Sequence, residues 1–176
     1  MLIYFLRHAN AGQRRKNLTR DEKRPLDNEG IEQCRYIGRL LAALDVHPDL
    51  IISSPLKRAT QTASLVGNEL GYEQKIQVDP VLRPGASFEE FRDSLRHRES
   101  LDTIIVVGHN PAMSRFLSLL VTGGAVERSI EMKKGSVARV DYNSKHSVLN
   151  WLITPKIAKT GYAITESSSR PKSSRK

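Results

Sequence analysis

Four residues of the chain, Arg7, His8, Arg58 and His109, have side chains that suit the chemistry of phosphoryl groups. Arginine presents a planar fork that matches phosphate oxygens, and it keeps its charge at ordinary pH. A neutral imidazole can attack phosphorus, while a second, protonated imidazole can stabilise the charge that builds on the phosphoryl oxygens. An isolated Arg-His pair is more often a solvated surface feature than a site. The chemistry therefore depends on whether the fold brings these four residues together.

Each of these residues follows an apolar run with the pattern of a buried strand. The run LIYFL precedes Arg7 and His8, DLIISS comes shortly before Arg58, and TIIVVG comes directly before His109. Such runs are typical of a parallel sheet covered by helices, and ligands bind beyond the carboxyl ends of its strands. For parallel neighbours, we expect one crevice that holds two arginines, two histidines and the N–H groups of helix N-termini.

The segments between and after these strands predict the rest of the fold. We expect helices over residues 27–45, 55–71, 88–98 and 111–121, with Pro55 in the first turn of the second helix. Asn110 and Pro111 are typical of the N-cap and the first position of the last helix. Strands over residues 135–142 and 147–153 would form a hairpin, whereas residues 77–84 have an irregular pattern. The alternation predicts a three-layer α/β/α sandwich with a mostly parallel central sheet and a C-terminal antiparallel hairpin.

The composition predicts one domain with a basic tail. At 176 residues and 19.8 kDa, the chain is long enough to bury a full core without disulfides or metals. Residues 1–160 would form this domain, and residues 161–176, rich in Ser, Lys and Arg, are predicted to be disordered. No apolar stretch approaches the ~20 residues of a membrane helix, and no signal-peptide pattern is present. We expect a cytoplasmic monomer that does not bind membranes.

The formal net charge of +9 raises the question of a nucleic-acid or an acidic partner. Many of the cations lie in the tail and in the segment GQRRKNLTRDEKR after the first strand. Aromatic residues make up only 6% of the chain, and no basic segment is interleaved with aromatic residues that would stack on single-stranded nucleic acid. The charge therefore favours an acidic phosphoprotein or a small phosphorylated substrate over nucleic acid. The connection over residues 9–26 is long for a strand-to-helix connection, which suggests a functional rim or lid.

Three motifs in this order resemble the histidine phosphatase superfamily, which includes the cofactor-dependent phosphoglycerate mutases and the histidine acid phosphatases. FLRHANAG resembles the RH-containing signature, SSPLKRATQTA the second motif and VVGHNP the third. The RHA-x-A form, the short chain and the stretch RPLDNEG are similar to the SixA-type phosphohistidine phosphatases. The resemblance runs from Met1 to about Leu152 and implies a phosphoglycerate mutase-like fold.

The resemblance also implies a role for each candidate residue. His8 would be the nucleophile that becomes transiently phosphorylated, and Arg7, Arg58 and His109 would hold the phosphoryl oxygens. Arg24 in RPLDNEG resembles a further arginine that SixA-type proteins place at the pocket, although it is also explained as one charge of a basic loop. We expect neither a metal nor a cofactor.

The general acid of both main branches is missing from this chain. Many members carry a glutamate after the second helix, where this chain has Val81, and the acid phosphatases place an aspartate where it has Asn110. A positioned acid is worth roughly 10²–10⁴-fold in rate, which an alkoxide leaving group would need. A phosphorylated imidazole needs it less, because it can take a proton from solvent and leave as neutral imidazole, whose conjugate acid has a pKa of ~6.5.

We therefore expect a metal-independent phosphatase that forms a phosphohistidine on His8 and hydrolyses phosphohistidine on a protein. A small phosphomonoester is an alternative substrate, and a phosphate-binding module without turnover is an alternative of a different class. Glu89, Glu90 or Asp27 could still supply a proton, although each is more simply explained as a solvated helix residue. Another alternative is that the basic tail tethers the domain to an anionic surface.

The remaining candidates have structural explanations. His47, His97 and His146 share no metal-ligand spacing with another histidine or a carboxylate, so we expect them on the surface. The pair Gly123-Gly124 would end the preceding helix, and Cys34 would pack in the core.

Overall fold

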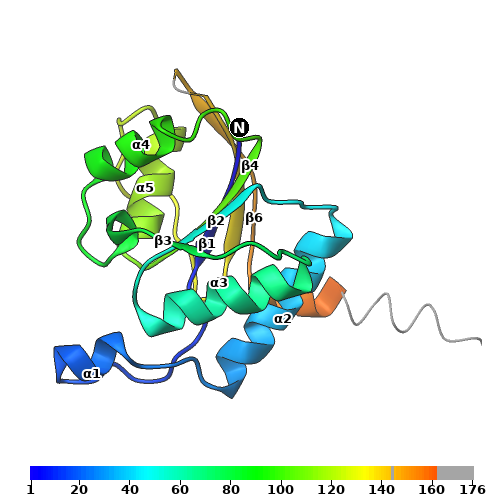
Figure 1. Ribbon diagram of the computed structural model, residues 1–176. Helices are drawn as coiled ribbons and strands as arrows, with labels where there is room; N and C mark the ends of the chain where they lie inside the picture. The colour runs from blue at the N-terminus through cyan, green and yellow to red at the C-terminus, as the bar shows by residue number, and fades with distance from the viewer. Residues whose placement is uncertain (144, 162–176) are drawn as a thin grey trace, which may run out of the picture.

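The computed structural model describes residues 1–143 and 145–161, and it shows a six-stranded sheet with helices on both faces (Figure 1). The strands are β1 (Leu2–Arg7), β2 (Leu50–Ser53), β3 (Gln77–Val78), β4 (Thr103–Gly108), β5 (Val137–Tyr142) and β6 (Ser147–Ile153). The helices are α1 (Leu18–Glu22), α2 (Asn28–Ala43), α3 (Lys57–Glu69), α4 (Phe88–Arg96) and α5 (Ala112–Val121), with a 3₁₀ turn over Pro80–Leu82. Residues 155–161 are also helical.

The sheet has the strand order β3-β2-β4-β1-β5-β6. The first four strands are parallel, while β5 and β6 add an antiparallel hairpin to the edge beside β1. Arg7 at the end of β1 lies beside Gly108 of β4, and Ser53 of β2 lies beside Val107. The carboxyl ends of β1, β2 and β4 therefore lie together, and the predicted sandwich with a mostly parallel sheet and a terminal hairpin is confirmed.

The central strands fill a core on each face of the sheet. Along β1, Ile3 and Phe5 join the core formed with α4 and α5, whereas Tyr4 and Leu6 join the core formed with α2 and α3. The buried residues of β4 alternate in the same way. Because successive side chains of a strand point to opposite faces, an apolar run is buried on both sides. Packing on both faces holds the strand ends in place, and with them the residues that follow.

The predicted start of α3 is wrong by two residues. The helix begins at Lys57, and Pro55 lies before it instead of in its first turn. The reason is that Leu56 has an extended backbone and donates its N–H to Ser54 Oγ at 3.4 Å.

The predicted start of α5 is also shifted. The helix begins at Ala112, with Pro111 at the cap position, so Asn110 is not the N-cap. The amide of Asn110 makes other bonds: its Oδ1 accepts from the Ser114 N–H at 3.3 Å, and its Nδ2 donates to Met132 O at 2.9 Å. These contacts tie the residue after His109 to the segment that precedes β5.

Several elements were not predicted. Helix α1 has only five residues and an exposed leucine, Leu18, so it lacks the apolar periodicity that reveals longer helices. Residues 77–84 contain the short β3 and the 3₁₀ turn, and residues 155–161 extend the chain beyond the hairpin as a helix. Residue 161 thus belongs to this helix, and the remainder of the predicted tail, residues 162–176, lies outside the described residues. Within the described ranges, no helix is long and apolar enough to cross a membrane.

Candidate active site

A pocket of about 560 Å³ lies at the carboxyl edge of the sheet. It is lined by all five residues expected at the site, Arg7, His8, Arg24, Arg58 and His109. The first two come from the end of β1, Arg58 from the first turn of α3, His109 from the residue after β4, and Arg24 from the connection that leads to α2. The predicted convergence of these residues is confirmed. A hollow of about 820 Å³ adjoins the pocket at Asn110 and Pro111, and no histidine lines it.

The imidazole of His8 is held with its lone pair on Nε2. Its Nδ1 lies 2.8 Å from Ala9 O, and a carbonyl oxygen can only accept a hydrogen bond, so Nδ1 carries the hydrogen. Burial, together with the charges of Arg58 and Arg7, lowers the pKa of His8 to about 3. His8 is therefore neutral at pH 7, with Nε2 available as a nucleophile.

The second imidazole, His109, lies against the first, with 4.8 Å between the ring centroids. Its Nε2 is hydrogen-bonded with Ser54 Oγ at 2.9 Å. Burial, followed by the charges of His8 and Arg58, lowers the pKa of His109 to about 2. This imidazole is therefore neutral at pH 7 in the structure, and not protonated as expected from the sequence. An anionic phosphoryl group between the rings would favour its protonated form, because an opposite charge stabilises it.

The loop over residues 12–23, called the arm from here on, contributes to the wall of the pocket with Gly12, Arg14, Leu18, Asp21 and Glu22. Figure 1 shows it as the projection that carries α1 away from the sheet. The length of this connection predicted a rim or lid, and the residues of the arm that line the pocket agree with a rim.

The arm is fastened to the pocket by the buried carboxylate of Asp21. Asp21 Oδ1 accepts from Arg24 Nε at 2.9 Å and from the Arg15 N–H at 2.9 Å. Arg58 donates from one terminal nitrogen to Asp21 O at 3.0 Å and to Asp21 Oδ2 at 3.4 Å. Burial alone would raise the pKa of Asp21, but the hydrogen bond from Arg15 and the charges of Arg24 and Arg58 lower it. Asp21 is thus a carboxylate that orients two arginines of the pocket.

Asp21 is the main functional residue that the sequence analysis missed. Its signal in the sequence is its position three residues before Arg24, a spacing at which opposite charges pair on a helix surface. Arg24 itself also bridges the two ends of the arm, because its terminal nitrogen donates to Ala11 O at 2.5 Å and to Gly12 O at 3.2 Å.

The segment before β5 supports the opposite wall. Met132 O accepts hydrogen bonds from a terminal nitrogen of Arg7 at 2.8 Å and from Asn110 Nδ2 at 2.9 Å. Lys134, which the sequence analysis also missed, lines the pocket and donates to Asn10 Oδ1 at 2.6 Å. The backbone of this segment thus orients Arg7. No sequence motif predicted this contact.

Two contacts fix the start of the connection after β1. The Ala9 N–H donates to Thr62 Oγ1 at 3.1 Å, and the Thr62 hydroxyl donates to Arg58 O at 2.7 Å. Asn10 packs directly on Gly30, since a Cβ atom at Gly30 would lie only 1.9 Å from Asn10 O. The glycine of the RPLDNEG stretch therefore allows the close approach of α2 to this loop.

Three buried nitrogen atoms at the pocket make no hydrogen bond with the described part of the chain: Arg7 Nε, Arg58 Nε and His109 Nδ1. These atoms belong to residues that line the pocket, and the guanidinium groups of its three arginines, Arg7, Arg24 and Arg58, suit an anion with several acceptor oxygens. The pocket therefore has the chemistry of an oxyanion site.

The expected absence of a general acid can be examined in the pocket lining. Val81, aligned with the superfamily's glutamate, packs against the core, and the Asn110 amide is engaged by its neighbours. Among the described residues, the carboxylates that line the pocket are Asp21 and Glu22. Asp21 is bound to two arginines, while Glu22 is about half exposed and accepts from Arg83 at 3.0 Å. Both carboxylates are therefore ion-paired with arginines.

The three acidic residues considered as substitutes lie outside the pocket lining. Glu89 and Glu90 are exposed on α4, where Glu90 forms a capping box with Ser87. Asp27 caps α2 by accepting from the Gly30 N–H. Their interpretation as helix residues agrees with the structure.

The other candidates also have the positions expected of structural residues. The side chains of His47, His97 and His146 are exposed, and no group of three potential metal ligands occurs among the described residues. Cys34 is buried, and burial raises the pKa of its thiol to about 12. The pair Gly123-Gly124 has positive φ angles of 62° and 89° and ends α5.

Comparisons with known proteins agree with this geometry. A model of the histidine phosphatase superfamily (branch 1) matches residues 3–84, which contain the first two motifs. An uncharacterized protein of Picosynechococcus sp. is 31% identical over 140 residues, covering 78% of this chain and 82% of that protein. The chain belongs to the histidine phosphatase superfamily.

Two of the similar proteins support the resemblance to the SixA type. The phosphohistidine phosphatase SixA of Escherichia coli is 25% identical over 168 residues, covering 93% of this chain and all of that protein. The structure of a protein histidine phosphatase SixA with tungstate has a TM-score of 0.80 at 24% identity, covering 89% of this chain and 98% of that one. A phosphoglycerate mutase from Bacillus anthracis has a TM-score of 0.68 at 15% identity, covering 92% and 96%. These similarities confirm the phosphoglycerate mutase-like fold, and the superfamily relationship supports phosphatase activity.

Proposed function

We propose that this phosphatase forms a phosphohistidine on His8 and hydrolyses phosphohistidine on a protein. The observation that carries the proposal is the composition of the pocket: a neutral nucleophile, several cations and two carboxylates that are ion-paired with arginines. Such a site suits a leaving group that takes its proton from solvent. The name of the Escherichia coli relative, a phosphohistidine phosphatase, supports the same substrate class.

In the first step, Nε2 of His8 attacks phosphorus and the bond between phosphorus and the substrate's imidazole nitrogen breaks. The other nitrogen of that imidazole carries a proton from solvent, so the leaving group departs as a neutral molecule. Arg7, Arg58 and His109 hold the phosphoryl oxygens and stabilise their charge. Arg24 would add to the positive potential around the phosphoryl oxygens, since it lines the pocket beside Arg58.

The backbone at Ala9 contributes to both steps. When Nε2 of His8 gains the phosphoryl group, the ring becomes positively charged, and its Nδ1–H remains bound to the carbonyl of Ala9. In the second step, water attacks phosphorus, the electron pair of the P–N bond returns to Nε2, and a proton of the water passes to the phosphate or to solvent. His8 leaves as a neutral imidazole because Nδ1 has kept its hydrogen, so this step needs no general acid.

The test is phosphate release from a phosphohistidine-bearing peptide in the presence of a metal chelator. His8→Ala should lower the rate at least about 10³-fold, because it removes the nucleophile. His47→Ala is the matched control, since this histidine is exposed and lies outside the pocket lining. An alkyl phosphate should be cleaved at least about 10²-fold more slowly than the peptide, because an alkoxide needs the missing acid.

Other outcomes would assign the alternatives. Equal rates on the alkyl phosphate and the phosphohistidine peptide would contradict the leaving-group argument and favour a small phosphomonoester. If neither compound nor an aryl phosphate released phosphate while the protein still bound inorganic phosphate, the domain would be a binding module.

A further inference from the structure

The arm has an inner side that belongs to the pocket. Asp21 binds Arg24 and Arg58, as described above, and Glu22 accepts from Arg83 at 3.0 Å. These contacts use both acidic residues of the arm. The remaining charged residues of the arm are Lys and Arg.

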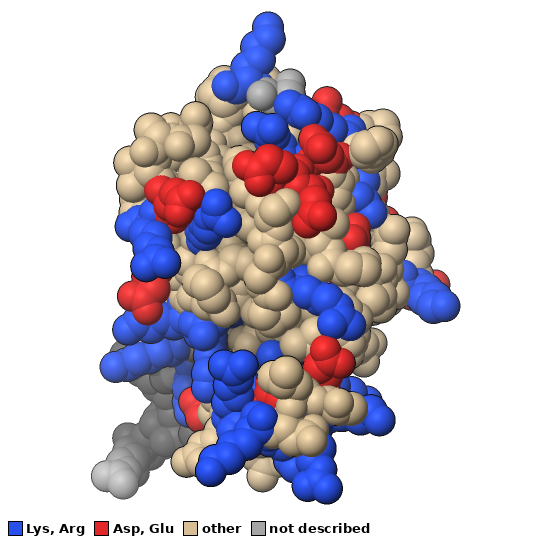
Figure 2. All heavy atoms as spheres, turned by 90° about the vertical axis from the view of Figure 1, so that its left-hand side faces the viewer, with Lys and Arg blue, Asp and Glu red and all other residues tan. Residues whose placement is uncertain are grey.

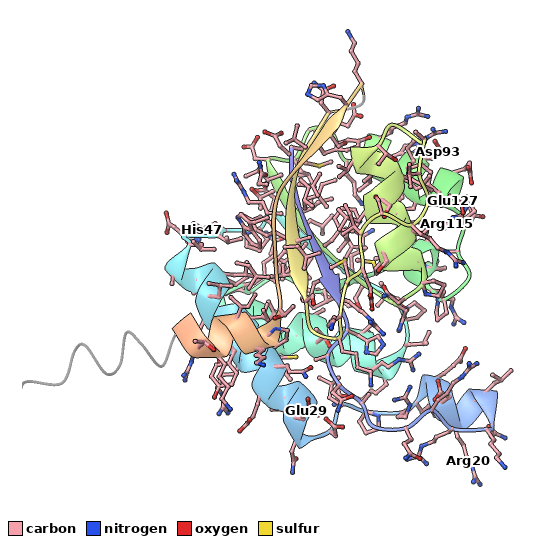
Figure 3. All side chains as sticks on the ribbon, turned by 180° about the vertical axis from the view of Figure 1, so that it is seen from behind. Arg20, Glu29, His47, Asp93, Arg115 and Glu127 are labelled. Carbon is pink, nitrogen blue, oxygen red and sulfur yellow. The ribbon has the colours of Figure 1, made fainter. Side chains whose placement is uncertain are left out.

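The outer side of the arm is basic. Arg15, Lys16, Arg20 and Lys23 are exposed outside the pocket lining, and none of them forms an ion pair with a described residue. Figure 3 shows Arg20 on the part of α1 that lies away from the sheet. Unlike the arginines of the pocket, these cations have no role in the folded domain that their contacts reveal. A concentration of like charge raises the local concentration of oppositely charged partners.

Leu18 adds an apolar contact to this surface. Its exposed fraction is 69%, the highest among the exposed large hydrophobic residues of the described chain, and it lines the pocket. Exposed leucines are common and need no explanation singly. This one lies at the mouth of the site between cations of the same short segment, where it would meet a macromolecule whose phosphoryl group had entered the pocket.

The rest of this face has mixed charge. In Figure 2, Lys and Arg side chains gather over the lower part, where α1 lies, whereas the upper part near α4 carries Asp and Glu side chains together with Lys and Arg side chains. Glu89, Glu90 and Asp93 of α4 are exposed. Positive charge without acidic neighbours is therefore concentrated on the arm, and this concentration would orient an acidic partner over the pocket.

We propose that the arm is a docking surface for an acidic protein segment that flanks the phosphorylated histidine of the substrate. The proposal rests on the proposed function and names the chemistry of its protein substrate. The segment would pair acidic side chains with Lys16 and Arg20 and place an apolar side chain on Leu18. Nucleic acid fits this surface less well, because the arm contains no aromatic residue for base stacking.

The test compares two synthetic phosphohistidine peptides of equal length, one flanked by Asp, Glu and Leu and the other by Ser and Gln. Phosphoimidazole, which lacks any flanking segment, is the third substrate. The wild type should have a kcat/KM at least about 10-fold higher for the acidic peptide at low ionic strength, and added salt should shrink the difference.

The decisive variant is Lys16→Glu combined with Arg20→Glu. It should lose most of the preference for the acidic peptide and change the rate on phosphoimidazole less than about twofold, since neither residue lines the pocket. Lys75→Glu combined with Lys145→Glu is the matched control: it changes the net charge equally, at two exposed positions outside the pocket lining. Leu18→Ala should reduce kcat/KM for the acidic peptide a few-fold in a salt-independent way.

The outcomes separate this proposal from the proposed function. Equal losses in the Lys16/Arg20 variant and in the Lys75/Lys145 control would overturn docking on the arm, as would a wild type that cleaves both peptides equally. Competition by a single-stranded oligonucleotide that disappears in the Lys16/Arg20 variant would assign the surface to nucleic acid instead. A wild type that cleaves neither peptide nor phosphoimidazole would overturn the proposed function and this proposal with it.

Discussion

The floor of the pocket and the arm above it are positioned by different means. Arg7, His8, Arg58 and His109 form the floor, and each lies at the end of a strand or in the first turn of a helix that the core holds in place. The arm is held by polar side-chain contacts, chiefly those of Asp21. The comparison teaches that the groups closest to the chemistry take their places from the backbone of the core, whereas the groups that would meet a partner depend on a few polar contacts.

Removal of a floor residue should have the largest effect on catalysis. We expect His109→Ala to lower kcat on phosphoimidazole about 10²–10³-fold, because the phosphoryl charge loses an imidazole that binding would protonate. Steady-state kinetics would check this, with the exposed His97→Ala as the control. An unchanged kcat would show that the second imidazole does not act on the transferring group.

Removal of the arm's main anchor should have a smaller effect. Asp21→Asn should lower kcat/KM roughly 10-fold on phosphoimidazole and on the acidic peptide alike, because Arg24 and Arg58 lose the carboxylate that orients them. Asp21→Glu, which keeps the charge, should restore part of the loss.

The affinity for inorganic phosphate shows whether Asp21 acts by positioning the two arginines or only through its negative charge. If Asp21 acted only through its negative charge, Asp21→Asn would bind phosphate more tightly, since the pocket would become more positive. We expect weaker binding, measured by competitive inhibition, with a melting temperature close to that of the wild type. Tighter binding would refute the role of Asp21 as a positioning residue.

A substitution at the junction of the two regions should act mainly on stability. In Gly30→Ala the new Cβ meets the backbone of Asn10, which has to move, at a cost of about 1–3 kcal/mol in the free energy of unfolding. Gly67→Ala is the matched control, because its Cβ would lie 3.2 Å from the side chain of Ile51 instead of from backbone. Denaturant unfolding would compare them, and equal stabilities would contradict the close approach.

The pH dependence of stability should report on the floor alone. Burial lowers the pKa of His8 and His109 below the ordinary value of 6.5, so the unfolded chain binds more protons as the pH falls below that value. Stability is then complete above about pH 6.5 and is lost as the pH falls toward the folded-state values. Between pH 7 and 5 we expect a loss of about 1–2 kcal/mol for each histidine.

A variant tests the assignment of this loss. His8→Gln combined with His109→Gln should remove most of the acid sensitivity in this pH range, while Asp21→Asn should leave it in place. Parallel pH profiles for the wild type and the double variant would show that other groups cause the loss.

The difference between floor and arm also explains what could be predicted from the sequence. An apolar strand has a recognisable pattern and a definite end, so the positions of His8 and His109 at the strand ends could be predicted from the sequence. Asp21 and Lys134 could not, because their positions depend on contacts between segments far apart in the chain. The helix starts at Pro55 and Asn110 were misplaced for a different reason, because local side-chain and backbone bonds shifted them by a residue or two.

The bridge that Arg24 makes to Ala11 and Gly12 brings the two ends of the arm together. The segment between them is therefore a closed insertion, comparable to a binding loop carried on a fixed scaffold. Its outer residues contribute little to the two cores, so they can be exchanged as a unit while Asp21 and Arg24 are kept. Replacing the residues of 13–20 that lie outside the pocket lining by acidic or apolar residues would thus be a direct way to test whether the arm selects the substrate.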